Sequence, residues 1–233
     1  PGADQGYNVK VPSYKFLARL DWNINENNKV NVRFSKTNNG YEASPSTSVN
    51  PMTADIIFPG DDKKGISSGK GASNDEGLYF RNARYRQEQR FTSVAGEWNL
   101  KWGVLNNTLR GTYSYQDEPR SYDGGAFPTT YILEDGAVYA MFGTELFTEG
   151  NVRQVKSFTI TDEATWAWGK HNFTAGLQFE HNKAVNGYMQ GGNGVYVFKS
   201  WNDFVAGEKP SSFFITHSNS TDFSQFTSQM KQM

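Results

Sequence analysis

Apolar and polar side chains alternate with a period of two in six segments of this chain. In residues 14–24, YKFLARLDWNI, every second position is apolar or aromatic, and the positions between them are mostly polar. This is the pattern of a β-strand that has one apolar and one polar face. The alternation recurs in residues 29–37, 91–102, 107–116, 155–168 and 172–182, and the final stretch FSQFTSQMKQM indicates the start of a seventh strand.

The connections between these segments alternate in length. Short turns join the first segment to the second, the third to the fourth and the fifth to the sixth, which predicts three hairpins. Long connections, expected to be loops, separate the hairpins: residues 38–88, 117–152 and 187–221. A soluble β-sandwich has little reason to sort its loops in this way. An outer-membrane β-barrel has short periplasmic turns and long extracellular loops, so the predicted fold is an all-β, antiparallel barrel wall.

Composition excludes several other classes of protein. A formal net charge of -1 argues against a polycation for nucleic acid, so no nucleic-acid partner is expected. The absence of Cys excludes a disulfide scaffold, a thiolate zinc site and a cysteine nucleophile. No stretch approaches the roughly 18 consecutive apolar residues of a membrane-spanning helix. This criterion does not exclude barrel strands, because their apolar and polar residues alternate. The chain begins at Pro1, without an initiator Met, and we expect it to be a piece of a longer polypeptide.

Five of the six tryptophans lie within a few residues of the short turns. Amphipathic indole rings settle at the interface between lipid and water, so these side chains predict an aromatic girdle on the periplasmic side. The alternative is a soluble core that keeps tryptophan at its strand ends. The girdle residues are Trp22, Trp98, Trp102, Trp166 and Trp168.

The polar positions of the strands include charges of both signs. A basic side chain at mid-depth in lipid costs roughly 2 to 4 kcal/mol, so the polar face is predicted to line the barrel lumen and the apolar face to contact lipid. Asp162 is an exception, because it falls with the apolar positions; either a β-bulge or a place near an interface would explain it. The predicted lumen-facing charges are Lys15, Arg19, Asp21, Arg33, Glu97, Lys101, Arg110, Glu163 and Glu180.

Several stretches resemble one family of outer-membrane proteins. GYNVKVPSYKFLARLDWNINENNKVNVRFS resembles the opening barrel strands of TonB-dependent receptors of the Oar-like group, typical of Bacteroidetes, and RNARYRQEQRFTSVAGEWN resembles the next hairpin. The most specific stretch is GKHNFTAGLQFEHNKAVNGY followed by GVYVFKSWNDFVAG. Residues 198–204 are similar to the "F-S-x-x-D-F" segment of the group, with Lys199 before Ser200.

The resemblance implies that this segment belongs to a larger barrel, expected to have 22 strands, in the bacterial outer membrane. In such receptors a carboxypeptidase-regulatory-like domain and a plug precede the barrel, and the TonB complex drives import of an extracellular ligand. The expected partners are outer-membrane lipid, the rest of the barrel and plug, the TonB complex through segments absent from this sequence, and an unidentified ligand. Six or seven strands alone would leave raw edges in the membrane, which hydrocarbon does not tolerate.

Two alternatives remain open. The same wall could belong to a non-transporting adhesin or assembly scaffold, which would lack a functional plug and TonB-contacting segment. A soluble β-rich binding module or a hydrolase of polar glycans would instead partition into the aqueous phase without detergent.

No group of residues indicates catalysis, a cofactor or a metal site, and none of these is expected. Residues 65–71, GISSGKG, have too few residues between glycines for a phosphate-binding loop. The acidic clusters at residues 61–62 and 134–136 lack the alternating ligands of a calcium loop and favour solvated turns. The histidines lack helical metal-ligand spacing: His171, His181 and His217. The aromatic run at residues 194–201 is either a ligand platform or packing within its own loop, and packing is favoured.

Overall fold

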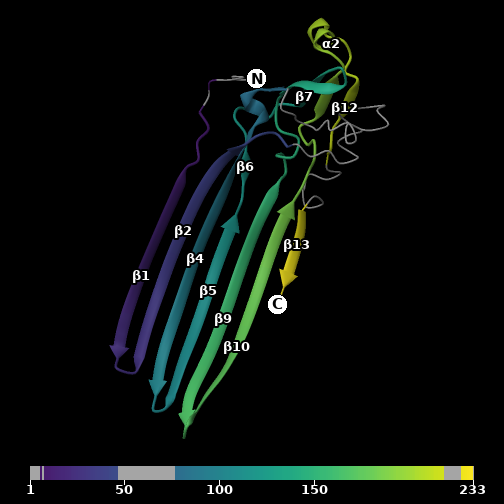
Figure 1. Cartoon of the computed structure of the whole chain (residues 1–233). Coiled ribbons are helices and arrows are strands. Elements are labelled where there is room, and N and C mark those ends of the chain that lie inside the picture. The colour runs from purple at the N-terminus through teal and green to yellow at the C-terminus, as the bar shows by residue number, and fades with distance from the viewer. Residues whose placement is uncertain (1–5, 7, 47–76, 218–226, 233) are drawn as a thin grey trace.

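The structure, a computed structural model, describes residues 6, 8–46, 77–217 and 227–232. Its main sheet is an antiparallel meander in the order β1-β2-β4-β5-β9-β10-β13, with β6 paired to β4 (Figure 1). We call this sheet the wall, and it is open at both edges. Its strands are β1 (Ser13–Asn25), β2 (Asn28–Ala43), β4 (Tyr85–Trp102), β5 (Leu105–Asp117), β6 (Arg120–Ser121), β9 (Val152–Trp168), β10 (His171–Gly187) and β13 (Thr227–Gln232).

A second sheet lies at the end of the wall opposite the three hairpin turns (Figure 1). Its strand order is β12-β11-β7-β8-β3, in which β11 pairs in parallel with β7 and β3 pairs in parallel with β8. We call this sheet, with its two short helices, the cap. Its elements are β3 (Leu78–Tyr79), η1 (Arg81–Ala83), β7 (Thr129–Glu134), β8 (Ala137–Phe142), β11 (Val195–Phe198), α2 (Trp201–Ala206) and β12 (Ser212–Phe214). Within the described residues, no helix has the length and apolar character to cross a membrane.

The cap corrects the expectation that residues 117–152 and 187–221 are loops. The first of these connections contains β6, β7 and β8, and the second contains β11, α2 and β12. The first five residues of β7, TTYIL, are all buried, so its two faces do not differ in polarity and the sequence does not alternate. The other cap strands have six residues or fewer, which is too short for a clear period.

Two wall strands extend well beyond the alternating segments. β2 continues to Ala43 and β4 begins at Tyr85, so the connection expected at residues 38–88 is shorter at both ends. Their register is continuous from the pair of Asn38 and Arg90 to the pair of Ala43 and Tyr85. Side chains here are mostly polar on both faces, while the backbone ladder, which does not depend on side-chain polarity, continues. The period-two signal therefore ends before the strands do.

The buried apolar side chains of the described residues lie in the cap and not in the wall. The larger of two clusters comprises Ala83, Tyr131, Leu133, Val138, Met141, Leu146, Phe147, Val195 and Val197. By contrast, β1 is exposed along its whole length, including Leu20 and Trp22. The described residues thus contain a protein-covered core in the cap and an apolar wall face that no protein covers.

Residues 134–136, one of the acidic clusters, form a hairpin turn. Asp135 and Gly136 have φ values of 50° and 72°, the two positive angles of a type I′ turn joining β7 to β8. The Glu134 carboxylate accepts a hydrogen bond from the backbone N–H of Trp201 at 2.9 Å. The other acidic cluster, at residues 61–62, and the glycine-rich residues 65–71 lie outside the described residues.

Candidate functional site

The wall register separates the predicted charges from the predicted girdle. Residues directly opposite each other in neighbouring strands share a face, and one row runs from Asp21 through Asn31 and Glu97 to Arg110. Alternation along each strand then assigns all nine charges to this face. The five tryptophans occupy the opposite face, with Trp98 opposite Val30 and Leu109.

Glu97 is the centre of a polar network on the charged face. Its carboxylate accepts hydrogen bonds from Arg110 Nε at 2.6 Å, Asn99 Nδ2 at 2.8 Å and Asn31 Nδ2 at 3.3 Å. Asn99 in turn accepts a hydrogen bond from Thr108 Oγ1 at 2.9 Å. The network joins β2, β4 and β5 across the face, which is chemistry suited to water or polar protein and costly in hydrocarbon.

Arg19 and Asp21 form a second ion pair on the same face, at 2.6 Å. The register places Arg33 directly opposite Arg19, so two cations stand side by side next to this pair. The remaining predicted charges are spread along the face opposite polar residues: Lys15 opposite Thr37, Lys101 opposite Asn106, Glu163 opposite Thr108 and Glu180 opposite Thr159. The structure therefore brings four of the nine charges into ion pairs and distributes the rest.

The five tryptophans lie near the hairpin turns. Trp102 and Trp168 are the last residues of β4 and β9 and are 77% and 74% exposed. Trp166 stacks on Phe173 with ring centroids 5.5 Å apart. Rings so exposed on an uncovered face are consistent with an interfacial position, which remains a prediction.

The structure excludes one of the two explanations for the place of Asp162 among apolar residues. The register of β9 with β5 and with β10 is unbroken across Asp162, so no bulge is present there. Asp162 lies in the same row as Leu109 and Trp98, and its carboxylate accepts a hydrogen bond from Asn107 Nδ2 at 2.8 Å. A place of Asp162 near an interface stays a prediction.

Glu145 is a carboxylate buried in the cap, with only 2% of its surface exposed. It accepts hydrogen bonds from Thr148 Oγ1 at 2.9 Å and from the backbone N–H of Phe147 at 3.0 Å, and the backbone N–H of Ser46 lies 3.4 Å away. Burial raises the pKa of this carboxyl above its usual value, and these hydrogen bonds oppose the rise. Glu145 thus links the turn after β8 to the segment that directly follows β2.

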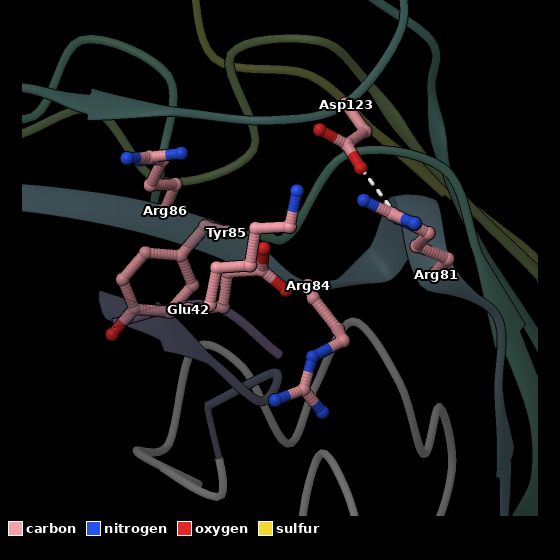
Figure 2. Close-up of a pocket in the computed structure, with 7 residues that line it drawn as sticks. Glu42, Arg81, Arg84, Tyr85, Arg86 and Asp123 are labelled. Atoms are coloured by element: carbon pink, nitrogen blue, oxygen red, sulfur yellow. Dashed lines mark hydrogen bonds and ion pairs between the residues drawn. The ribbon is translucent and has the colours of Figure 1, made fainter. Parts of the chain in front are cut away.

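A cavity of about 170 Å³ opens where the cap meets the wall. Figure 2 shows Arg81 bonded to Asp123 on one side of the cavity, at 2.6 Å, with Arg86 and Tyr85 on the other. Four cations face two carboxylates, so the cavity has an excess of positive charge and can accept an anionic group. Its lining residues are Lys10, Glu42, Arg81, Arg84, Tyr85, Arg86 and Asp123.

This cavity was not expected from the sequence. The run RNARYRQEQR carries four arginines within residues 81–90 and is the one local signal that could have indicated it. Asp123 comes from a different connection, and only the folded chain brings it to Arg81. Among the described residues, no three His, Asp or Glu side chains form a group that could hold a metal ion.

The aromatic run at residues 194–201 packs within the cap, which was the favoured interpretation. Val195 and Val197 are fully buried, and the Phe198 ring meets the Phe204 ring edge to face at 5.3 Å. Between them, Ser200 caps α2 by accepting a hydrogen bond from the backbone N–H of Asp203 at 3.1 Å. The segment at residues 198–204 is thus a packed helix start.

An open antiparallel wall with a charged face, an uncovered apolar face and sorted connections has the features of an outer-membrane β-barrel. The family model described as outer membrane beta barrel domain matches residues 5–231. The chain belongs to this family, and the protein is located in the bacterial outer membrane. Searches of curated proteins and of solved structures gave no match.

Proposed function

We propose that this chain is part of the barrel wall of a TonB-dependent receptor that imports an extracellular ligand. In this arrangement the charged face of the wall lines the lumen, around a plug supplied by the rest of the protein. The hairpin turns point to the periplasm and the cap points outward. The apolar face, with its tryptophans, contacts lipid.

One observation carries the proposal: segments from all three long connections form a single ordered cap at one end of the wall. Unstructured loops would suffice to link barrel strands, whereas a packed cap with a positively charged cavity at its base offers a binding surface. Anionic groups of a ligand are the chemistry that Lys10, Arg84 and Arg86 would attract there.

A non-transporting adhesin or assembly scaffold is the second candidate. It is favoured by exposed apolar side chains on α2, where Trp201 is 43% and Val205 is 65% exposed. Figure 1 shows α2 at the far tip of the cap, a suitable place to contact another surface. An exposed apolar patch of this kind is typical of a protein contact.

The two functions differ in their need for TonB. Detergent-purified full-length protein is mixed with the periplasmic C-terminal domain of the TonB of its host, and binding is measured by calorimetry. The transporter proposal expects binding, and it expects inactivation of TonB to remove any growth advantage that the receptor confers. A full-length protein that does not bind TonB, and whose effect on growth does not depend on TonB, would be an adhesin or scaffold.

A further inference from the structure

Three side chains at the cap end of the wall lie next to one another on its apolar face. The register places Tyr115 of β5 opposite Lys156 of β9, and Lys156 opposite Lys183 of β10. Lys156 Nζ lies 5.6 Å from the centre of the Tyr115 ring. Toward the hairpin turns, the same face continues with the pair of Phe158 and His181 and then with the pair of Ile160 and Phe179. This cluster, here called the lysine row, is a cationic border on an apolar surface.

The distance from the tryptophans places the lysine row at the far edge of an apolar band. Lys156 and Trp166 are ten residues apart along β9, as are Phe173 and Lys183 along β10. Ten residues span about 33 Å along a strand. With a strand tilt of about 40°, this corresponds to a height of about 25 Å, the height of the apolar band of an outer-membrane barrel. If Trp166 marks the periplasmic interface, the lysine row lies at the outer one.

The lysine row has an excess of positive charge. Like charges directly opposite each other in a sheet are destabilising, and Lys156 and Lys183 form such a pair. The carboxylate of Asp117, on the same face, is already contacted by Gln154 Nε2 at 3.1 Å and by Arg90 at 3.7 Å. An external anion would relieve the repulsion between the two lysines.

We propose that Lys156 and Lys183, beside Tyr115, bind a phosphate group of an anionic lipid in the outer leaflet of the outer membrane. The two ammonium groups contact the phosphate, and the tyrosine ring lies at the depth of the headgroups. The acyl chains lie against Phe158, Ile160 and Phe179 below. In a lipid, the phosphate neutralises the charge of the two lysines, and the attached acyl chains cover the apolar side chains next to them. The inference rests on the assignment of this face to lipid in the proposed function, but not on transport.

Binding of lipid A carrying two phosphates tests the proposal. Full-length protein in detergent is titrated with this lipid and followed by native mass spectrometry. The variants are the double substitution K156Q and K183Q, the charge-preserving pair K156R and K183R, and K170Q in the turn between β9 and β10 as a matched control. We expect the glutamine pair to weaken binding roughly 30-fold, from about fivefold for each lysine, while the other two variants bind like the wild type.

Two further arms exclude other sources of the signal. Dephosphorylated lipid A should bind as weakly to the wild type as the intact lipid binds to the glutamine pair. Inorganic phosphate at millimolar concentration should not displace the lipid; displacement would indicate a free-phosphate site and overturn the proposal. Unchanged binding by the glutamine pair would overturn it as well. If that pair does not fold, as judged by heat-modifiable gel mobility, K183Q alone should show the fivefold loss. TonB binding is unaffected by these outcomes, so the two proposals fail separately.

Discussion

At the scale of single residues, the polar groups of the protein fall into two environments. Glu97 and Arg110 pair on a face where the arginine side chain is 59% exposed, and a pair so accessible to water contributes little to stability. Glu145 is buried in the cap and receives hydrogen bonds from Thr148 and Phe147. A buried carboxyl has a much larger effect on stability, because its charged form is costly to desolvate.

The stability of the cap should therefore depend on pH through Glu145. Burial raises its folded-state pKa above the ordinary value of 4.5, so the folded cap binds this proton more tightly than the unfolded chain does. The stabilisation is fully present below that ordinary value and is lost as pH rises through the raised pKa. Hydrogen-exchange protection of β7 and β8, corrected for intrinsic rates, should fall over this range. In E145Q the fall should disappear; an equal fall in wild type and variant would contradict the assignment.

At the scale of elements, each wall strand has two faces that differ in polarity. Ile160 and Thr161 are neighbours on β9, and the register places them opposite Gly111 and Arg110 respectively. Ile160 shares the face of the tryptophans, and Thr161 shares the face of the charges. Because the two faces differ so strongly in polarity, the same substitution at these two adjacent residues should have measurably different effects on stability.

A lysine introduced at these two positions should have very different costs. Ile160→Lys places a charge between the tryptophans and the lysine row and should lower the free energy of unfolding by about 2 to 4 kcal/mol. Thr161→Lys, its matched control on the charged face, should change it by no more than about 0.5 kcal/mol. Denaturant unfolding of the full-length protein in lipid vesicles gives both values. Equal costs would mean that the apolar face does not contact lipid.

The tryptophans at the ends of the wall strands allow an independent test of depth. In variants of the full-length chain that keep a single tryptophan, Trp102 and Trp168 should be quenched strongly by lipids brominated near the headgroup. Trp201, which is in the cap, is the control and should be quenched only by acrylamide in the water phase. Strong lipid quenching of Trp201, or none of Trp168, would refute the girdle.

At the scale of the whole molecule, the protein has two parts that are stabilised differently. The wall is held by long backbone ladders, and the buried apolar side chains of the described residues lie in the cap. The cap draws β3, β7 and β11 from three different connections, so it can form only after the wall has brought those connections to one end. The cap should therefore open without loss of the wall.

Met141→Ala tests this independence. Met141 is fully buried in β8, and its truncation should destabilise the cap by about 2 to 5 kcal/mol. Tyr139→Ala, on the same strand but 48% exposed at that position, should have a much smaller effect. Hydrogen exchange should increase in β7 and β8 of the Met141 variant and stay unchanged in β9 and β10. Increased exchange throughout the wall would show that the two parts fold as one unit.

The sequence by itself determined the wall, its two faces and the class of the chain, an outer-membrane β-barrel domain. Alternation can be read locally, because each side chain of such a strand points to one of two faces, and its polarity matches that face. In β2 the alternating pattern ended at residue 37, but the strand continues to Ala43 with mostly polar side chains on both faces. Two explanations were open for Asp162, and the register excluded the β-bulge.

Only the tertiary structure decided the cap and the cavity at its base. The cap strands are short, and β7 is buried on both faces, so periodicity does not distinguish them from loops. The Asp135-Gly136 turn between β7 and β8 is a local hairpin signal, but it does not show which other strands they pair with. β11 pairs in parallel with β7, more than sixty residues earlier, and Asp123 meets Arg81 across forty-two residues. Such contacts depend on where the wall strands hold the ends of each connection, and no local pattern of residues encodes that position.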